Sequence, residues 1–327
     1  MKNDSSKALR MGILGLGKIS QKAMIPAFQS SARTQLVAVA SSSYAKAEKV
    51  CASLPGVKAY GSYESLLEDS DVDAVYIALP NHLHKEWTIK AAEASKHVLC
   101  EKPTALSCDE LKAMSFSCKA HDVKLMEALM YRLHPQHEQV RMCIANGDIG
   151  SIKYFKAQFS YYLEDDQNIR RRPECGGGAL NDVGVYVLDS VRYIVGEEPA
   201  DGSLSQVFAK ENGVDESSAI QLSFPSGVQA HLFCSMATTR INRYEVIGSE
   251  GSIEVPHAYI PAPGQRSHIV IKNQAGQNII KMPPFNQYAA ELDVFAKTVA
   301  GEFSKDWPTE GELNTRIIEN LRLKQAI

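Results

Sequence analysis

The chain has 327 residues, of which 44% are hydrophobic and 22% are charged. This balance is typical of a globular protein, and the length suits two domains, each able to bury its own core. The formal net charge of −3 gives no broad cationic field for a phosphate backbone, so nucleic acid is excluded as an expected partner.

The seven cysteines are an odd number without C-x-x-C pairs, so we expect reduced thiols. The apolar run at residues 11–16 is too short for a secretory signal. No stretch approaches the roughly 18 uninterrupted apolar residues of a membrane span. We therefore expect a cytoplasmic protein without a membrane partner.

Short apolar runs alternate with helical patterns in the first part of the chain, which predicts βαβ units and a doubly wound parallel sheet. This nucleotide-binding domain is expected to span residues 1–126. The expected strands are 11–17, 36–41, 74–79, 97–102 and 123–129, and the expected helices are 19–29, 45–53, 84–94 and 108–121.

After Pro135 the pattern changes, and residues 127–327 are expected to form an α+β domain. Helices are expected to about residue 146, at 179–195, at 288–300 and at 310–326. Period-two runs indicate strands that form an antiparallel meander. These runs are residues 152–162, 218–224, 228–236, 244–249, 251–255 and 268–272.

The segment Gly15-Leu16-Gly17-Lys18-Ile19-Ser20 follows an apolar strand and opens a helix, as a dinucleotide fingerprint does. The first glycine permits a tight turn, and the second lets a pyrophosphate approach the backbone near the helix N-terminus. We expect Gly15, Gly17, Lys18 and Ile19 to bind the cofactor. An ordinary glycine turn is the alternative.

At the end of the second expected strand the chain reads Ser41-Ser42-Ser43, with Lys46 shortly after. An NAD enzyme usually presents Asp or Glu there to the ribose. Hydroxyls and an ammonium group would instead accept a 2′-phosphate. Ser41, Ser42 and Lys46 therefore favour NADP(H), while NAD(H) stays possible and a plain polar loop is the alternative.

Two further segments carry candidate chemistry. Glu101-Lys102-Pro103 follows a strand at the carboxyl edge of the sheet, where ligands of open α/β folds bind. The second segment is a glycine run, residues 176–178, followed by Asp182 and Tyr186. Because they are four residues apart on an expected helix, their side chains share one face. A tyrosine hydroxyl with a cation nearby can exchange protons with an alcohol or ketone.

These motifs, with residues 84–94 and the Gly-Gly-Gly-Ala-Leu-x-Asp-x-Gly-x-Tyr segment, resemble the glucose-fructose oxidoreductase/inositol dehydrogenase (Gfo/Idh/MocA) family over nearly the whole chain. Tyr186 stands where the commonest family pattern has His. This departure is similar to the branch that contains dimeric dihydrodiol dehydrogenase and NADP-dependent sugar dehydrogenases.

The resemblance implies an N-terminal Rossmann domain and a C-terminal domain with a large open sheet that forms homodimers or homotetramers. By position it makes Lys102, Tyr186 and Asp182 catalytic. It also places Pro80, Asn81, His84, Glu101, Lys102 and Arg132 near the cofactor. Tyr161 and Arg170, with Lys102, Asp182 and Tyr186, are expected to bind the substrate, and Arg132 and Arg170 to face the substrate cleft. For His84 a packing role is the alternative. No metal is expected, because His82 and His84 lack a third ligand at suitable spacing.

The predicted function is hydride transfer between NADP and a hydroxyl or keto carbon of a sugar, polyol or dihydrodiol. Tyr186 would exchange the hydroxyl proton while Lys102 polarises the same oxygen. The alternatives are a nucleotide-sugar 3-ketoreductase, an NAD-dependent glycosidase and a non-catalytic NADP-binding regulator with the same fold.

Overall fold

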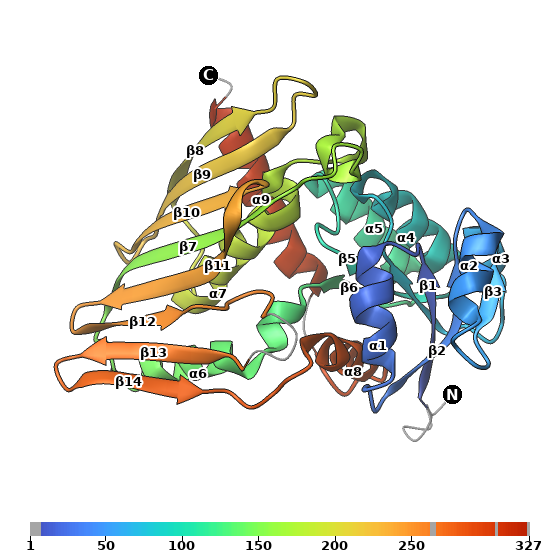
Figure 1. Ribbon diagram of the computed structural model, residues 1–327, viewed down its shortest axis with the longest axis horizontal. Helices are drawn as coiled ribbons and strands as arrows, with labels where there is room; N and C mark the ends of the chain where they lie inside the picture. The colour runs from blue at the N-terminus through green and yellow to red at the C-terminus, as the bar shows by residue number, and fades with distance from the viewer. Residues whose placement is uncertain (1–7, 262–265, 305–306, 326–327) are drawn as a thin grey trace. The chain divides into compact units, whose positions relative to one another are not determined.

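The computed structural model describes residues 8–261, 266–304 and 307–325 (Figure 1). The chain divides into two compact units. The first contains the residues up to Met130 together with Asn286–Thr315, and the second contains Tyr131–Phe285 together with the residues from Arg316 onward. The sequence analysis places a border at 126/127 and assigns 286–315 to the second domain, whereas this segment returns to the first unit.

The first unit is built on a six-stranded parallel sheet with the order β3-β2-β1-β4-β5-β6. Its expected fold class is confirmed. The strands are β1 (Leu9–Leu14), β2 (Thr34–Ala40), β3 (Lys58–Tyr60), β4 (Ala74–Ile77), β5 (His97–Glu101) and β6 (Leu125–Ala128). The three-residue strand β3 is absent from the sequence-based expectation, since so short a run carries no periodicity.

Helical segments connect these strands, and the expected helices form within a few residues of their predicted bounds. The helical segments of this unit include η1 (Ser20–Met24), α1 (Ile25–Phe28), α2 (Tyr44–Cys51), α3 (Tyr63–Leu67), η2 (Asn81–Leu83), α4 (His84–Glu93), α5 (Cys108–Ala120) and α8 (Gln287–Val299). Of these, α3 and η2 are absent from the sequence-based expectation, and α8 comes after the last described strand of the chain. Ser62 and Ser107 cap the N-termini of α3 and α5 by accepting backbone N–H groups.

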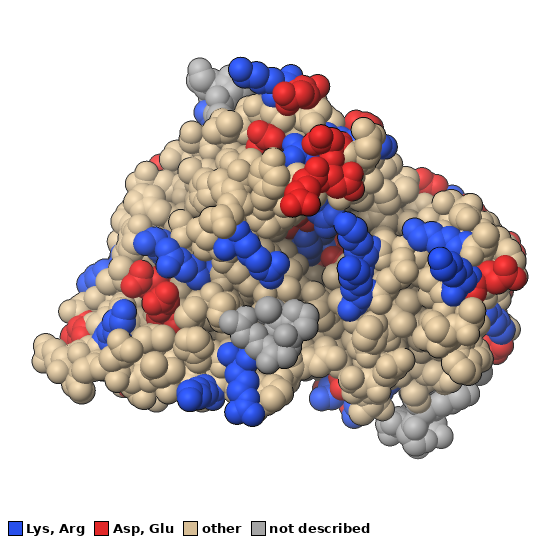
Figure 2. All heavy atoms as spheres, in the orientation of Figure 1, with Lys and Arg blue, Asp and Glu red and all other residues tan. Residues whose placement is uncertain are grey.

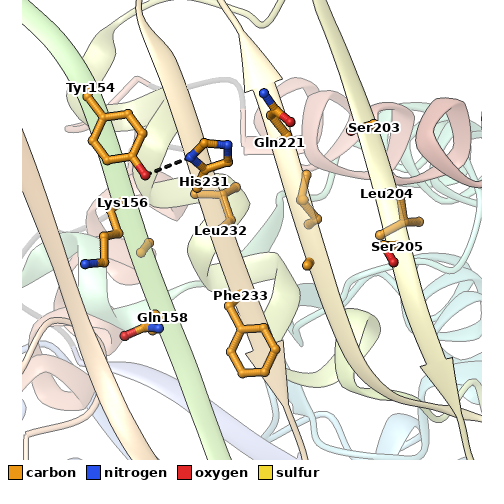
Figure 3. Close-up of a pocket in the computed structure, with 13 residues that line it drawn as sticks. Tyr154, Lys156, Gln158, Ser203, Leu204, Ser205, Gln221, His231, Leu232 and Phe233 are labelled. Carbon is orange, nitrogen blue, oxygen red and sulfur yellow. Dashed lines mark hydrogen bonds between the residues drawn. The ribbon is translucent and has the colours of Figure 1, made fainter.

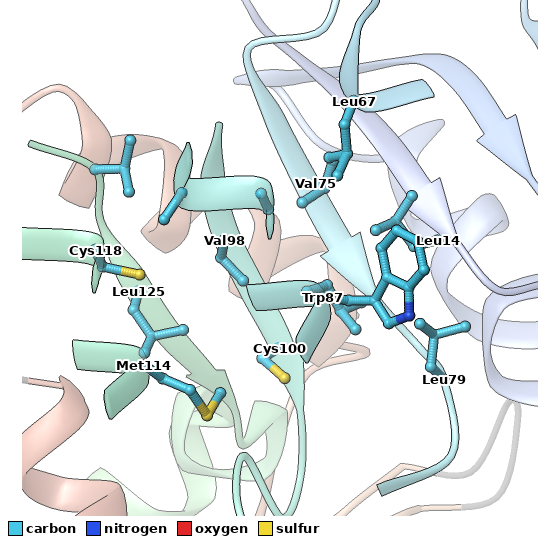
Figure 4. Packing of buried hydrophobic residues seen from close by; sticks show 14 of the residues in the cluster. Leu14, Leu67, Val75, Leu79, Trp87, Val98, Cys100, Met114, Cys118 and Leu125 are labelled. Carbon is cyan, nitrogen blue, oxygen red and sulfur yellow. The ribbon is translucent and has the colours of Figure 1, made fainter. Parts of the chain in front are cut away.

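Hydrophobic side chains fill both faces of the parallel sheet. On one face Trp87 of α4 packs against Leu14, Leu79 and neighbouring aliphatic residues (Figure 4). On the other face Leu292 and Phe295 of α8 belong to a second buried cluster with residues of β1, β4, β5 and β6. Burial on both faces explains why these strands read as continuous apolar runs rather than as alternating ones.

The second unit contains an eight-stranded sheet with the order β14-β13-β12-β11-β7-β10-β9-β8. The strands are β7 (Ile152–Tyr162), β8 (Asp201–Phe208), β9 (Asp215–Ser223), β10 (Gln229–Ser235), β11 (Ala237–Gly248), β12 (Gly251–Val255), β13 (His268–Asn273) and β14 (Gly276–Lys281). The sheet is mostly antiparallel, as expected, but a simple meander is wrong. Strand β7 lies between β10 and β11 and runs parallel to β10.

The remaining helical segments are η3 (Met130–Leu133), α6 (Pro135–Ala145), η4 (Ile169–Arg171), η5 (Pro173–Cys175), η6 (Leu180–Gly184), α7 (Val185–Val195) and α9 (Trp307–Gln325). The expected helix at 310–326 is α9, and position 326 lies outside the described residues. None of the described helices is long and apolar enough to cross a membrane.

The two faces of the eight-stranded sheet differ. Along β7 the alternate residues Phe155, Ala157 and Phe159 are buried on the face that α7 covers. Tyr154 and Lys156, on the opposite side of the pleat, are only half-buried. Helices cover one face in Figure 1, and the other face of the strands is left without a helix in the described part of this unit.

Candidate functional site

The turn between β1 and the first helix has the conformation that a dinucleotide fingerprint requires. Gly15 has φ +97°, and a Cβ added to it would lie 2.6 Å from the carbonyl oxygen of Ala78. At Gly17 an added Cβ would meet no atom within 4 Å, so space is open beside its backbone. Buried Ser20 donates to the carbonyl of Gly15 at 2.7 Å. The turn is thus held rigidly, with room for a phosphate at Gly17.

Ser41 and Ser42 differ in exposure at the end of β2. Ser41 is buried, and its hydroxyl accepts the backbone N–H of Ser43 at 3.3 Å. Ser42 and Lys46 are exposed. Tyr44, which the sequence analysis does not single out, is 54% exposed beside them. An exposed aromatic ring can stack on a nucleotide base. The position of Tyr44 directly after the serine run is therefore a signal in the sequence for contact with the adenine of a dinucleotide.

His84 links two turns at the carboxyl edge of the parallel sheet. Its ring is fully buried, with Nε2 2.9 Å from the carbonyl oxygen of Leu79 and Nδ1 2.9 Å from that of Pro103. Burial lowers the pKa of the imidazole. The packing role given as the alternative for His84 agrees with these contacts, and its expected place near the cofactor stays a prediction. His84 holds the turn at Pro80 and Asn81 against the turn that contains Lys102.

The Glu101-Lys102-Pro103 turn is close to two further acidic side chains, Glu127 and Glu291. The hydroxyl of buried Tyr76 donates to Glu101, whose other carboxylate oxygen accepts the backbone N–H of Lys102 at 3.2 Å. Glu291 of α8 is 1% exposed, and its Oε1 has no hydrogen-bond partner among the residues that the structure describes. Burial, and then the charges of Glu101 and Glu127, raise the pKa of Glu291 well above its ordinary value.

Glu291 is not among the residues that the sequence analysis expects at the site. No motif surrounds it in the sequence, and α8 has the pattern of an ordinary amphipathic helix. A signal exists in the helix pattern, because the acidic residue lies between Ala289, Leu292 and Phe295 on the apolar face of α8.

Three predicted residues of the second unit lie together. The hydroxyl of Tyr161 donates to Asp182 Oδ2 at 2.5 Å, and the other carboxylate oxygen of Asp182 pairs with Arg170 Nε at 2.9 Å. Asp182 is 8% exposed, whereas the side chain of Arg170 is 42% exposed. Burial, and then the charge of Asp182, raise the pKa of Tyr161. Asp182 is thus held at both oxygens and orients two groups that can hydrogen-bond to a ligand.

The glycine run explains how Arg170 reaches Asp182. The N–H of Gly178 donates to the carbonyl of Arg170 at 2.9 Å, and the N–H of Asp182 donates to the carbonyl of Gly178 at 3.0 Å. A Cβ on Gly177 would lie 2.4 Å from the same Arg170 carbonyl oxygen. Only glycine allows the 170–172 segment to approach the start of the helix this closely.

Tyr186 lies one turn beyond Asp182, and both side chains face strand β7, as their spacing predicts. Asp182 meets Tyr161, and the Tyr186 ring packs edge-on against Phe159 at a centroid distance of 5.2 Å. The rings of Tyr131 and Tyr259 enclose Tyr186 at 5.8 and 5.7 Å. Tyr186 is 3% exposed, so its ring is fixed by packing.

Arg132 is held by a buried ion pair in the second unit. Its guanidinium pairs with buried Asp189 of α7, with Nε 2.6 Å from Asp189 Oδ2, and the residue is 8% exposed. The hydroxyl of Tyr131 donates to the same carboxylate. The buried carboxylate of Asp189 thus engages the planar guanidinium of Arg132 and fixes the segment beside Tyr186. The expected place of Arg132 near a cofactor or substrate stays a prediction.

A hollow of about 380 Å³ lies on the uncovered face of the eight-stranded sheet (Figure 3). Outward side chains of β7, β10, β9 and β8 line it, among them Lys156, Gln221 and Phe233. Tyr154 Oη is 2.7 Å from His231 Nδ1 at one end of the hollow. None of the predicted catalytic, cofactor or substrate residues lines it.

Two family models match the chain, one in each of its two units. Residues 9–129 match the family model described as oxidoreductase family, NAD-binding Rossmann fold (GFO_IDH_MocA), and residues 137–254 match the GFO/IDH/MocA C-terminal domain.

Several relatives are similar over most of the chain. One is the dTDP-3,4-didehydro-2,6-dideoxy-α-D-glucose 3-reductase of Saccharopolyspora spinosa, which is 34% identical over 98% of this chain and 97% of its own. The D-xylose 1-dehydrogenase (NADP⁺) 2 of Haloferax volcanii is 35% identical over 89% of each chain. Among solved structures, a 3-ketoreductase from Actinomadura kijaniata in complex with NADP and TDP-benzene is 29% identical. It superimposes with a TM-score of 0.91 over 97% of this chain and 98% of its own.

Proposed function

The chain belongs to the Gfo/Idh/MocA oxidoreductase family, and from this premise we propose that it transfers a hydride between NADP(H) and a hydroxyl or keto carbon of a sugar-like substrate. The observation that carries the proposal is the arrangement of Tyr161, Arg170 and Asp182 beside Tyr186 on one face of β7. A non-catalytic regulator would have no need of a tyrosine held by packing beside an oriented carboxylate.

The first unit fits a dinucleotide. The open space beside Gly17 is a cradle that a Cβ would fill, and it lies at the start of a helix, where phosphates bind. In the proposal Gly15, Gly17, Lys18 and Ile19 hold the pyrophosphate, and the turns at Pro80 and Asn81 and at Glu101 line the nicotinamide end.

NADP(H) is proposed over NAD(H) for two reasons. The exposed Ser42 and Lys46 bring a hydroxyl and a cation, without a carboxylate, to the end of β2. The xylose dehydrogenase relative is named for NADP⁺, and the similar ketoreductase structure contains NADP.

Each side chain of the site has a proposed part in the reaction. Tyr186 gives and takes the proton of the substrate hydroxyl, and Lys102 donates a hydrogen bond to the same oxygen. Arg170 and Tyr161, both oriented by Asp182, bind substrate hydroxyls. When bound, NADP(H) supplies or accepts the hydride. The Actinomadura ketoreductase structures include variants in which a lysine or a tyrosine is replaced, which supports the choice of these two residue types.

A nucleotide-linked keto-sugar is the second candidate substrate. Relatives named as dTDP-sugar 3-reductases match almost the whole chain. The exposed guanidinium surface of Arg170 and the exposed Arg172 next to it could pair with a diphosphate. A free sugar, a polyol and a dihydrodiol do not need such a partner.

The uncovered face of the eight-stranded sheet is the proposed homodimer or homotetramer interface. The surface over β8 to β10 is largely uncharged in Figure 2. It contains the hollow around His231 and Phe233 (Figure 3). Exposed uncharged groups such as Gln221 and His231 surround the half-buried Phe233 there, and an aromatic side chain among uncharged groups is typical of an interface between subunits. A location in the cytoplasm stays a prediction.

The test begins with the binding of NADP(H) and NAD(H), measured by calorimetry. Absorbance at the nicotinamide band then follows turnover with aldoses, polyols, trans-dihydrodiols and nucleotide-linked keto-sugars. We expect tighter binding of NADP(H) and turnover on one sugar class. Tighter binding of NAD(H) would contradict the cofactor assignment. Tight NADP(H) binding without turnover on any class would contradict the enzymatic proposal and favour a regulator, and release of free sugar without net NADPH would identify a glycosidase.

A further inference from the structure

The helix that carries Asp182 and Tyr186 begins against a carboxylate from another part of the second unit. Asp215, the first residue of β9, is 5% exposed. Its Oδ2 accepts the backbone N–H of Leu180 at 2.7 Å and the hydroxyl of Ser218 at 3.0 Å. Leu180 is the first residue of η6. Asp215 therefore satisfies a backbone donor that a helix start leaves without an intrahelical partner.

The same carboxylate explains why residue 178 is glycine. A Cβ added to Gly178 would lie 2.0 Å from Asp215 Oδ1, and Gly178 has φ +108°. The backbone of the glycine run and the carboxylate are thus packed so closely that no side chain fits between them. Asp215 fixes the path of the chain as well as its first hydrogen bond.

Arg322 of α9 adds a further hydrogen bond at the start of this helix. The guanidinium of Arg322 in α9 donates to Asn181 Oδ1 at 3.0 Å, and Asn181 Nδ2 donates to the carbonyls of Gly176 and Gly177 at 3.1 and 3.2 Å. Burial raises the pKa of Asp215, whereas the Leu180 N–H, the Ser218 hydroxyl and the charge of Arg322 oppose that shift. Buried donors around a carboxylate favour its charged form.

We propose that Asp215 is a positioning residue for the reaction, which sets the place of Asp182 and Tyr186 by holding the start of their helix. This inference rests on the proposed function, since it gives Asp215 an effect on turnover. Asp182 follows the capped residue by half a turn, so a shift of the helix start reaches it directly. A misplacement of about 1 Å at a reacting group can reduce turnover by about 10²-fold.

The experiment compares Asp215→Ala with Asp215→Asn in the full-length protein. Alanine removes the acceptor of the Leu180 N–H, whereas asparagine keeps one oxygen for it. We expect Asp215→Ala to reduce kcat by about 10²-fold, with the Kd for NADPH unchanged, because the fingerprint lies in the other unit. Asp215→Asn should recover most of the lost kcat.

Leu222→Ala is the matched control, because Leu222 is 1% exposed on the same strand and has no proposed part in binding or catalysis. It should lower the Tm with kcat kept. A kcat loss in Leu222→Ala as large as in Asp215→Ala, or a wild-type kcat in Asp215→Ala, would overturn the inference. If Asp215→Ala does not fold, Asp215→Glu decides, because it keeps the charge but moves the acceptor by one methylene group toward a helix start that leaves no room for it. A wild-type kcat in Asp215→Glu combined with unaltered exchange at residues 180–186 would overturn the inference.

Hydrogen exchange separates this inference from the proposed function. In Asp215→Ala the amides of residues 180–186 should lose protection while those of β10 keep it, whether or not a substrate has been found. Unchanged protection at residues 180–186 would overturn the positioning role even in an active enzyme. If protection is lost in Asp215→Ala but the wild-type protein turns over no substrate class, the proposed function is contradicted. The proposed effect of Asp215 on kcat is then contradicted as well, whereas its role in holding the helix start is kept.

Discussion

Packing fixes the ring of Tyr186, the residue proposed for proton transfer. The rings of Tyr131, Phe159 and Tyr259 surround it, so its orientation costs little further entropy when substrate binds. Asp182, one turn earlier, is engaged by Tyr161 and Arg170. In the proposed mechanism Asp182 therefore orients the groups that bind substrate, and Tyr186 transfers the proton.

Replacement of Tyr186 by Phe tests this assignment. The ring and its packing stay, and only the hydroxyl is lost. We expect kcat to fall by about 10²–10⁴-fold, the usual contribution of a general acid or base, with an unchanged Kd for NADPH. Stopped-flow turnover and fluorescence titration give the two quantities. Tyr162→Phe, at the 65% exposed last position of β7, is the control and should keep the wild-type kcat. Turnover of Tyr186→Phe within a few-fold of wild type would remove Tyr186 from the mechanism.

Glu291 is a buried acid whose pKa is raised well above the ordinary 4.5, through burial first and then Glu101 and Glu127. In the unfolded chain its carboxyl group ionises at a lower pH than in the folded protein. Its contribution to stability is therefore fully present below the unfolded pKa and is lost as pH rises toward the folded pKa. Each unit by which the pKa is raised is worth about 1.4 kcal/mol.

Glu291→Gln should remove this pH dependence, because glutamine has the same shape and stays neutral. We expect the variant to gain stability relative to wild type between pH 5 and pH 8, measured by urea unfolding at both pH values. The exposed Glu93→Gln is the control. Wild type and Glu291→Gln with parallel stability curves over this range would show that Glu291 is charged in the folded protein.

At the scale of elements, the turn between β1 and the helix that follows it contains two glycines with different roles. Gly15 is needed for folding, and Gly17 is proposed to be needed for cofactor binding. Gly15 has a positive φ and no room for a Cβ beside Ala78. Gly17 has room for a Cβ in the folded protein, and only a bound phosphate would compete for that room.

Two substitutions in this turn should therefore have opposite effects. Gly15→Ala should lower the Tm, since left-handed backbone strain costs about 1–3 kcal/mol and the overlap with Ala78 adds to it. Gly17→Ala should keep the Tm and weaken NADPH binding by about tenfold or more, equal to about 1.4 kcal/mol. Calorimetry measures both quantities. Wild-type affinity in Gly17→Ala would exclude close contact between this backbone and the cofactor.

At the scale of the molecule, the proposed interface between subunits is the face of the eight-stranded sheet that its helices do not cover. Phe233 on β10 lies within the hollow and points outward (Figure 3). A charge placed there would be desolvated on association, which is costly without a partner of opposite sign.

Phe233→Glu should convert the oligomer to monomer, measured by size-exclusion chromatography with light scattering. Phe116→Glu, at a 75% exposed position of α5 in the other unit, is the control and should keep the wild-type mass. A wild-type protein that is monomeric at micromolar concentration, or an unchanged mass in Phe233→Glu, would contradict the proposed interface.

The sequence by itself determined the parallel sheet, most helices, the fingerprint turn and the common face of Asp182 and Tyr186. Those features follow from periodicity and turn chemistry within a few neighbouring residues. It also determined the resemblance to the family that the comparisons confirm.

Only the tertiary structure decided the features that depend on residues far apart in the chain. These include β7 between β10 and β11, the return of α8 to the first unit, the buried pair of Arg132 with Asp189, and the cap of Asp215 on Leu180. In each case the partner of a polar group is set by which strands and helices pack together. No local pattern encodes that choice, because burial and pairing are properties of the assembled core.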